Sequence, residues 1–538
     1  MAITINAGSI DRTTHTFLSA DSNQALGIGQ YAVAFMNAKS AAQGRGVPGK
    51  VVIEKTNLFH VDSVLCGLSA LALGTNAPAV LRAEALRYAT PRGGFGSQSG
   101  VGKDGRSGVP VFGSMSQCFA EKAIAANSAA VREWDSNGTN FGYNPKLGHT
   151  AGEFGHNDFY PVAIGAAQLA GKDGEYALRG MILLDEIRGR LAEVFSLKTY
   201  KIDHVLHGAI GSAATYGAML GATPEQIEHA IGMVVAHHVP FRAIRAGKQL
   251  SDSKGSSAAI TTEAAIVCMQ RAMHGFIGPK DIFRNPEAVF CLFEKPKDKA
   301  RSPFDLVLAR SGDDFAVMSM HFKLGLYEHQ SAGALQALLN LLAKNSSLLT
   351  DTTGGVIKNI TVVAYEPAFG IIGDPAKRDP RTRQSADHSM VYIISTLLRK
   401  ALEQQTTDWA TLMLSPADYN EQAIFNPLTR KLMEKITFKH GGAEYDSKYP
   451  EGIPTSMIIT DTSGRSHDSG LVMFPTGHAK NTDADLKALL KHKFLLLGAL
   501  AVSDPAATIE RFSDLHKKTA AEIEDLYNFS ILDGGKFE

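Results

Sequence analysis

A single segment of the chain, residues 134–160, concentrates side chains that could carry acid–base chemistry. It reads WDSNGTNFGYNPKLGHTAGEFGHNDFY and holds Asp135, Thr139, His149 and His156 among glycines and aromatic residues. Two alanine-rich segments, AEKAIAANSAA and PVAIGAAQLAG, flank it, and their composition favours helices buried against other helices. We therefore expect a polar loop set into a helical core. Because buried polar groups must be satisfied internally or serve a ligand, this loop is predicted to form part of an active site.

Further histidines and cations recur in two segments that follow. KIDHVLHGAIG places His204 and His207 three residues apart at a probable helix start. The loop 234–265 then concentrates basic side chains, among them Arg245 and Lys254, before a run of small residues. Such a density of cations between apolar helices would suit a di- or tricarboxylate, which arginine and lysine bind through charge-assisted hydrogen bonds.

The second half of the chain adds two more groups. Lys323 and His329 stand at the start of an amphipathic helix, and His388 and Tyr392 follow the basic run 377–383. Each group has a purely structural alternative. A lone histidine beside a helix is more often a hydrogen-bonded core residue than a catalyst, and a basic run is usually a solvated surface.

No metal or cofactor is expected. The chain has no HExxH pattern, and its four cysteines are too widely scattered for a zinc or iron–sulfur site. The glycine-rich segment 92–110 departs from a phosphate-binding loop, since Asp104 follows Lys103 where that loop needs serine or threonine. We interpret this segment as a flexible loop or flap.

Composition excludes several classes of function. The 538 residues carry 54 Lys and Arg against 54 Asp and Glu, a balance that argues against a general nucleic-acid binder and against polybasic membrane attachment. No run of about 18 apolar residues suggests a membrane span. The first residues resemble neither a signal peptide nor a transit peptide, so we expect a cytoplasmic protein, or a mitochondrial one if a transit peptide has been removed.

The type of secondary structure predicted for the elements that position these residues changes along the chain. Helical periodicity dominates from about residue 24 to 290 and returns at 483–502 and 510–527. Between them, 356–366 and 435–440 have the β-branched content of strands, and 455–474 is typical of a hairpin. The predicted fold is mostly α: an all-helical domain from residues 1–316 and 478–538, with a smaller α+β lid domain, 317–477, inserted in it.

Eight segments carry a resemblance to known proteins. They read FHVDSVLCGLSALALG, VREWDSNGT, FGHNDFYPVAIGAAQ, IDHVLHGAIGSAA, SDSKGSSAA, FKLGLYEHQSA, DHSMVYIISTLL and PTGHAKNTDADLKALLKHKF. In this order they resemble the MmgE/PrpD family over nearly the whole chain. The resemblance implies the same architecture, a helical domain with an inserted α+β lid, and a homodimer.

The resemblance also implies site residues. The family's Asp-x-x-x-Thr and Gly-His correspond to Asp135, Thr139 and His156, its Asp-His to His204, and its lysine before the small-residue helix to Lys254. The remaining matches are the family's lysine and histidine at the lid boundary and its His-Ser-x-x-Tyr, which correspond to Lys323, His329, His388, Ser389 and Tyr392. One departure is that Asn157 and Asp158 follow His156, where relatives commonly have proline and serine. Another is an insertion containing His149.

The activity that the resemblance implies is dehydration of 2-methylcitrate to 2-methyl-cis-aconitate without a cofactor. His156, held by Asp135, would be the base or acid nearest the reacting carbons. His204, Lys254 and Tyr392 would bind carboxylates or carry the second proton. A further set would bind the tricarboxylate: Thr139, Lys323, His329, His388 and Arg245.

Two alternatives remain open at this point. One is a cis-aconitate decarboxylase, or another lyase or isomerase of small di- or tricarboxylates. The other is a non-catalytic, metabolite-binding member of the family, against which the complete set of titratable residues argues.

Overall fold

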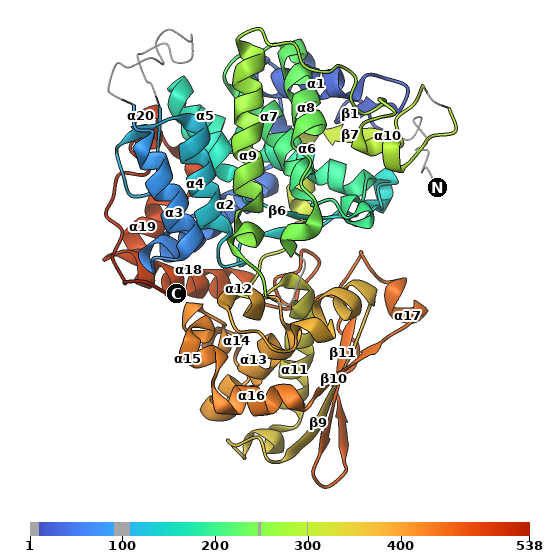
Figure 1. The fold of residues 1–538 in the computed structure, drawn as a ribbon, viewed down its shortest axis with the longest axis vertical. Helices are drawn as coiled ribbons and strands as arrows, with labels where there is room; N and C mark the ends of the chain where they lie inside the picture. The colour runs from blue at the N-terminus through green and yellow to red at the C-terminus, as the bar shows by residue number, and fades with distance from the viewer. Residues whose placement is uncertain (1–9, 91–107, 246–248, 299, 538) are drawn as a thin grey trace.

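The computed structural model describes residues 10–90, 108–245, 249–298 and 300–537. It is mostly helical with small sheets, which confirms the predicted fold class at that level. In Figure 1 the blue-to-green helices gather in an upper part, and the gold and orange elements lie below them. The glycine-rich segment 92–110 falls almost entirely outside the described residues, so its prediction as a flap stays a prediction.

The upper part is built from alanine- and glycine-rich helices. At its centre α7 is buried at every residue and packs on α5, α6, α8 and α9. Gly208 allows one of these contacts, because a Cβ atom there would lie 2.0 Å from the ring of Phe159. Its helices are α1 (Gln24–Asn37), α2 (Lys50–Ala72), α3 (Asn76–Arg87), α4 (Ala120–Arg132), α5 (Tyr160–Ala170), α6 (Gly174–Val194), α7 (Val205–Met219), α8 (Pro224–His237), α9 (Asp252–Met273) and α10 (Val289–Phe293).

Short strands tie the loops of the upper part together. They pair as β1 with β7, β2 with β8, β3 with β4, and β5 with β6. Their bounds are β1 (His15–Leu18), β2 (Val47–Pro48), β3 (Val109–Pro110), β4 (Gln117–Cys118), β5 (Thr139–Phe141), β6 (Phe154–His156), β7 (Leu306–Ala309) and β8 (Ser311–Gly312).

The lower part combines helices with one four-stranded sheet of order β10-β9-β11-β12. Its helices are α11 (Ala332–Lys344), α12 (Arg383–Ala386), α13 (Met390–Gln404), α14 (Trp409–Leu412), α15 (Glu421–Ile424), α16 (Pro427–Glu434) and α17 (Ala443–Asp446). Its strands are β9 (Ile357–Ala364), β10 (Ile436–His440), β11 (Thr455–Asp461) and β12 (Ser466–Asp468). The strand predictions at 356–366 and 435–440 and the hairpin at 455–474 are confirmed. Strand β9 alternates buried and more exposed residues, because only one face of the sheet packs on helices such as α11.

The chain passes between the two parts twice, and the passages lie side by side. In the first passage Phe322 donates its backbone N–H to the carbonyl of Gly477 in the second, at 2.9 Å. The first passage also pairs with β5, since His321 and Thr139 exchange backbone hydrogen bonds of 2.7 and 3.1 Å. The β5–β6 hairpin is thereby fixed to the junction between the parts.

After the second passage the chain rejoins the upper part (Figure 1). Three helices follow: α18 (Leu486–Ala501), α19 (Pro505–Phe512) and α20 (Ala520–Glu524). Helix α18 packs on α2 and α20 packs on α5. The helical texture predicted over 510–527 is present but divided, because Ser513 is extended and Thr519 starts a new capped helix.

One further property follows from helix length and composition. No single described helix is both long and apolar enough to cross a membrane, and α2 and α3 meet the two requirements only together, across a 90° bend.

Candidate active site

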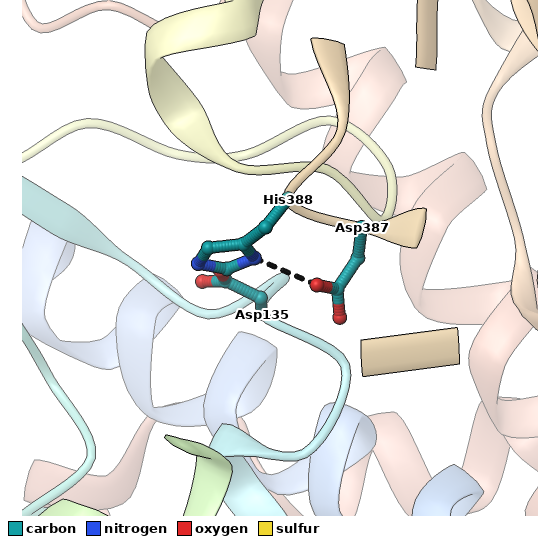
Figure 2. A group of neighbouring side chains, drawn as sticks. All are labelled: Asp135, Asp387 and His388. Carbon is teal, nitrogen blue, oxygen red and sulfur yellow. Dashed lines mark hydrogen bonds and ion pairs between the residues drawn. The ribbon is translucent and has the colours of Figure 1, made fainter. Parts of the chain in front are cut away.

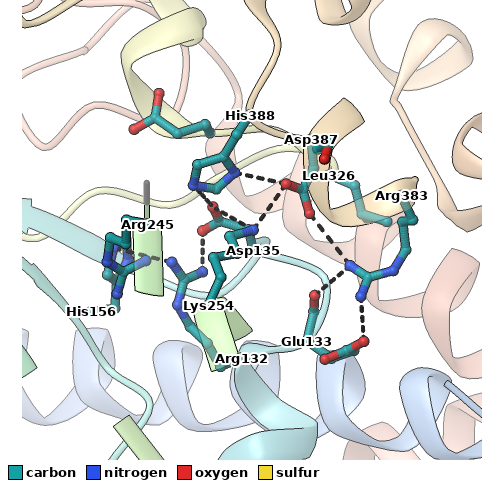
Figure 3. Close-up of polar contacts among 12 residues, drawn as sticks. Arg132, Glu133, Asp135, His156, Arg245, Lys254, Leu326, Arg383, Asp387 and His388 are labelled. Atoms are coloured by element: carbon teal, nitrogen blue, oxygen red, sulfur yellow. Dashed lines mark hydrogen bonds and ion pairs between the residues drawn. The ribbon is translucent and has the colours of Figure 1, made fainter. Parts of the chain in front are cut away.

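The carboxylate of Asp135 is the centre of a buried ionic network (Figure 3). Asp135 follows the end of α4 and has φ of 49°, a left-handed conformation that aspartate tolerates better than most residues. Its Oδ1 accepts hydrogen bonds from Arg132 and Lys323, and its Oδ2 lies 3.3 Å from His388 Nε2 and 3.8 Å from Lys254 Nζ. Burial alone would raise the pKa of Asp135, but Arg132, Lys323 and Lys254 outweigh it and hold the pKa well below its usual range. Asp135 is therefore a permanent anion, not a proton carrier.

A second carboxylate, Asp387, lies beside the first. It accepts hydrogen bonds from Lys254 Nζ at 2.9 Å and from His388 Nδ1 at 2.7 Å, and Arg383 lies 3.4 Å away. Both ring nitrogens of His388 therefore face carboxylate oxygens, Nδ1 that of Asp387 and Nε2 that of Asp135. Burial lowers the pKa of His388 to about 3, and the Lys254 ammonium adds to the effect.

Asp135, Asp387 and His388 also lie close enough together to hold one metal ion (Figure 2). Their charges are already matched, however, because Lys254 bridges the two carboxylates and Arg132 adds a further cation. A divalent ion would have to displace that lysine and would face strong repulsion. The charge balance thus disfavours a metal here, and the expected absence of one stays a prediction.

His156 is positioned by the β5–β6 hairpin, where it pairs directly with Thr139. Its Nε2 lies 3.4 Å from an Arg132 nitrogen and accepts from it, while Nδ1 has no hydrogen-bond partner among the described residues. Burial lowers the pKa of His156 well below its usual value, and the Arg132 charge adds to this, so the ring is neutral. Arg132 stands between the two side chains, so Asp135 acts on His156 through this arginine and not by a direct hydrogen bond.

His204 lies at the N-terminal end of α7, with its ring centroid 5.2 Å from that of His156. Neither ring nitrogen has a hydrogen-bond partner within the described part of the chain. Asp203 Oδ1 lies 3.5 Å from Nδ1, but Arg245 binds the same carboxylate through two nitrogens. Burial lowers the pKa of His204 well below its usual value, although Asp203 opposes the effect. The ring is therefore neutral and has a free lone pair that can accept a proton, and a nearby anionic carboxylate of a substrate would raise its pKa towards the working pH.

These side chains surround a small cavity of about 60 Å³ between the two parts of the molecule. Ligand pockets usually have about 300–1,000 Å³, so this cavity is small for a ligand site. The upper part contributes Arg132, Asp135, Thr139, Phe141, Phe154, His156, His204, Arg242 and Arg245, and the passage and lower part contribute Glu328, Gln330, Ile371, Ile372, Lys377 and His388.

The cations that are available in the cavity differ from those that the sequence predicts. Lys254 and Lys323 reach the network but do not line the cavity, and Arg245 is paired with Asp203. By contrast, Arg242 Nη1 has no partner among the described residues, and no hydrogen bond joins Lys377 Nζ to any of them. Burial lowers the pKa of both side chains, which increases the benefit of a bound anion.

Glu328 is a lining residue that the sequence interpretation missed. It is half-buried, and its Oε2 accepts the backbone N–H of Gln330 at 2.8 Å. Burial and the negative charge of Asp135 raise the pKa of Glu328 to about 7, although Lys323 acts in the opposite direction. The signal for it in the sequence was weak: one carboxylate between a predicted site lysine and a predicted site histidine.

Besides Lys254 and Lys323, two more predicted site residues, Tyr392 and His329, do not line the cavity. The hydroxyl of Tyr392 donates to the carbonyl of Asp418 at 2.5 Å, so the predicted catalytic role receives no support. The ring of His329 stacks on that of His321, with 5.1 Å between the ring centroids, and also contacts the ring of Phe141. His329 is therefore not placed to bind a substrate in the cavity.

A larger cavity of about 930 Å³ lies elsewhere, between the end of α6 and the segment 294–305. His149, from the insertion that separates Asp135 and His156, lines it and bonds Glu193 at 2.9 Å. Lysines and carboxylates alternate along its wall, without the converging histidines of the smaller cavity. The smaller cavity is therefore the candidate active site.

Known proteins with a similar sequence share a low sequence identity with this chain. The chain is 24% identical to 2-methylcitrate dehydratase of Escherichia coli K12 over 336 residues, which cover 61% of this chain and 64% of the relative. It is 23% identical to a probable 2-methylcitrate dehydratase of Saccharomyces cerevisiae, with coverage of 60% and 61%, and to an alkylcitrate dehydratase of a fungal species, with 57% and 58%. The chain thus spans less than two thirds of the length of these relatives.

Family models cover much more of the chain. The MmgE/PrpD N-terminal domain matches residues 48–302, and the MmgE/PrpD C-terminal domain matches residues 327–517. The first match contains Asp135, His156 and His204, and the second contains Glu328 and His388, so both halves of the cavity fall within the matched regions. The chain belongs to the MmgE/PrpD family.

Proposed function

We propose that this protein is a hydro-lyase that removes water from 2-methylcitrate to give 2-methyl-cis-aconitate, using protein side chains alone. The observation that carries the proposal is the cavity, where neutral histidines with unused nitrogens lie beside unpaired cations. Relatives named as dehydratases of methylcitrate and alkylcitrate support the same class of reaction.

The chemistry requires cations first. Removing a proton from carbon next to a carboxylate builds up negative charge on that carboxylate, and fixed positive groups lower the barrier. Arg242 and Lys377 are assigned to the substrate carboxylates because both line the cavity and neither forms an ion pair with a described residue, Arg242 Nη1 having no hydrogen-bond partner among those residues. Arg132, whose charge is shared with Asp135, lies next to His156 and adds to the positive potential.

A base must then take the proton from carbon. We assign this role to His204, since both of its nitrogens are unused and the ring is neutral at working pH. His156 accepts from Arg132 through Nε2, so its neutral form carries the proton on Nδ1 and can donate a hydrogen bond to the substrate. His388, oriented by Asp387, is the remaining neutral imidazole of the wall.

Closure of the site implies a lid. The cavity is too small for a tricarboxylate to enter unaided, and its walls come from both parts of the molecule. We therefore assign residues 317–477 the role of a lid that opens for substrate and closes to exclude water.

The test is a reaction with the purified protein after treatment with a metal chelator. 2-Methylcitrate, citrate and cis-aconitate are supplied separately, with ultraviolet absorbance to follow the conjugated alkene and NMR to identify products. A rising alkene signal with 2-methylcitrate supports the proposal. Conversion of cis-aconitate to itaconate, without reaction of 2-methylcitrate, would replace it by a decarboxylase, and no reaction with any of the three would refute the substrate assignment.

A further inference from the structure

The residues assigned so far leave one proton transfer without a donor. Elimination of water requires a proton for the departing hydroxyl group, because hydroxide is a poor leaving group. The histidines of the cavity are neutral, and Asp135 and Asp387 are held ionised by the cations around them. None of these groups is a good acid at neutral pH.

Glu328 differs from the other carboxyl groups of the site in how it is surrounded. Asp135 accepts from Arg132 and Lys323, and Asp387 accepts from Lys254, whereas no cation among the described residues donates a hydrogen bond to Glu328. Within the described part of the chain its carboxyl group accepts a hydrogen bond from the Gln330 backbone N–H, a neutral donor. A carboxyl group held this way can keep a proton more readily than one in an ion pair.

Its position is also fixed independently of the carboxyl group. The backbone N–H of Glu328 donates to the carbonyl of Asp387 at 3.0 Å, which joins the first passage between the parts to the segment before α13. Glu328 lines the same cavity as His204 and Lys377. Glu328 is thus held at the wall that also carries the proposed base and a carboxylate-binding cation.

We propose that Glu328 is the catalytic acid of the hydro-lyase reaction proposed above, on which this assignment rests. His204 takes the proton from carbon, and the electron pair of the C–H bond becomes the new C=C bond. The C–O bond breaks with its electron pair on oxygen, and Glu328 gives that oxygen its proton, so that water leaves. The enzyme ends with Glu328 ionised and His204 protonated, and exchange of one proton through solvent restores both.

Several charged and titratable groups act on Glu328. Asp135 favours its protonated form, and Lys323 and Lys377 favour its ionised form. Tyr365 and Tyr449 lie near enough for its charge to raise their own pKa values. With these opposing influences the pKa of Glu328 lies at about 7, so the protonated form is populated below that pH and lost above it.

The test compares Glu328→Gln with Glu328→Asp and with Glu434→Gln, an exposed glutamate of α16, as the matched control. Glu328→Gln keeps the size of the side chain but has no proton to transfer. Loss of a general acid typically costs 10²–10⁴-fold in rate, and we expect that loss in kcat with KM little changed. The fall of wild-type kcat/KM above pH about 7 should disappear in Glu328→Gln, while Glu328→Asp should keep it with a lower rate.

A substrate analogue separates catalysis from structure. When fluoride replaces the hydroxyl group, the leaving group no longer needs full protonation, so Glu328→Gln should approach wild-type turnover of this analogue. Equal loss on both substrates, or full activity of Glu328→Gln on 2-methylcitrate, would overturn the assignment of Glu328 while leaving the hydro-lyase intact. A wild-type protein that dehydrates no tricarboxylate would overturn the proposed function, and Glu328 with it.

Discussion

At the scale of single residues, the cavity separates cations that are already neutralised from cations that can still bind an anion. Lys254 and Lys323 hold the carboxylates of Asp387 and Asp135, and this pairing keeps the network rigid. Arg242 and Lys377 have no such partner among the described residues. Because charge-assisted hydrogen bonds are the strong ones, the second pair should contribute most of the affinity for the substrate carboxylates.

Replacement of Lys377 or Arg242 by alanine should therefore weaken substrate binding. A hydrogen bond to a charged group contributes about 1.5–3 kcal/mol, which corresponds to a rise in KM of roughly 10- to 150-fold. Arg381→Ala is the matched control, since Arg381 belongs to the same basic run but is exposed and bonds Asp379. Steady-state kinetics on 2-methylcitrate measures this, and an unchanged KM in both variants would contradict the assignment.

Most residues that line the cavity could be predicted from the sequence, but their pairing could not. Asp135, Thr139, His156, His204, His388 and Arg245 were all named from spacing and resemblance, and all line the cavity. The sequence could not show which cations are paired, because Lys254 and Asp387 are 133 residues apart. Nor could it show Glu328, whose properties depend on the burial and the neighbouring charge that only the fold creates.

At the scale of elements, a short π-helix supplies part of the apolar wall. The segment Ala368–Ile372 is π-helical, and its Ile371 and Ile372 line the cavity together with Phe141 and Phe154. π-Helical turns are rare and often occur at functional sites. An unsubstituted tricarboxylate has little use for an apolar wall, whereas the methyl group of 2-methylcitrate can be buried against it.

Shortening this wall should change the choice of substrate. One methyl group in an apolar pocket is worth about 10- to 200-fold in kcat/KM, so Ile372→Ala should lose most of the preference for 2-methylcitrate over citrate and should accept longer alkylcitrates better. Ile424→Ala, a buried isoleucine of α15 outside the cavity, controls for a general loss of packing. Competition between 2-methylcitrate and citrate measures the ratio of their kcat/KM values. An unchanged ratio in Ile372→Ala would show that this wall does not bind the alkyl group.

The elements were predicted unevenly, for physical reasons. The start of α8 forms a capping box between Thr223 and Gln226, a feature that sequence can indicate because capping depends only on neighbouring residues. The π-helical turn and the β5–β6 pairing were not predicted, since tertiary contacts impose them. The break within 510–527 does not show in the apolar spacing, which continues across it while the backbone does not.

At the scale of the whole molecule, three buried histidines lie where the chain passes between its two parts. His321 in the first passage stacks on His478 in the second, with ring centroids 4.0 Å apart, and His329 stacks on the other side at 5.1 Å. Burial lowers the pKa of all three, that of His478 to about 3, and Lys480 and Lys55 add to the effect on His478. These three imidazole rings are therefore neutral in the folded protein.

This arrangement predicts that the protein loses stability in mild acid. Unfolded histidine binds a proton below pH of about 6.5, whereas these folded rings do not, so the free energy of unfolding falls as pH decreases from there towards their folded pKa values. Each such ring costs about 1.4 kcal/mol per pH unit in that range. Chemical denaturation at pH 7, 6 and 5 should show a shallower fall for His478→Asn than for the wild type, and parallel falls would contradict the prediction.

The most direct test of the central claim follows alkene formation from 2-methylcitrate by chelator-treated wild-type protein and by His204→Asn. His207→Asn is the matched control, because His207 is buried in the same helix but does not line the cavity. We predict full activity of the wild type without added metal, retention of activity in His207→Asn, and a loss of roughly 10²–10⁴-fold in His204→Asn. Wild-type activity that requires an added metal ion, or His204→Asn as active as the wild type, would contradict a reaction carried by the neutral histidines of this cavity.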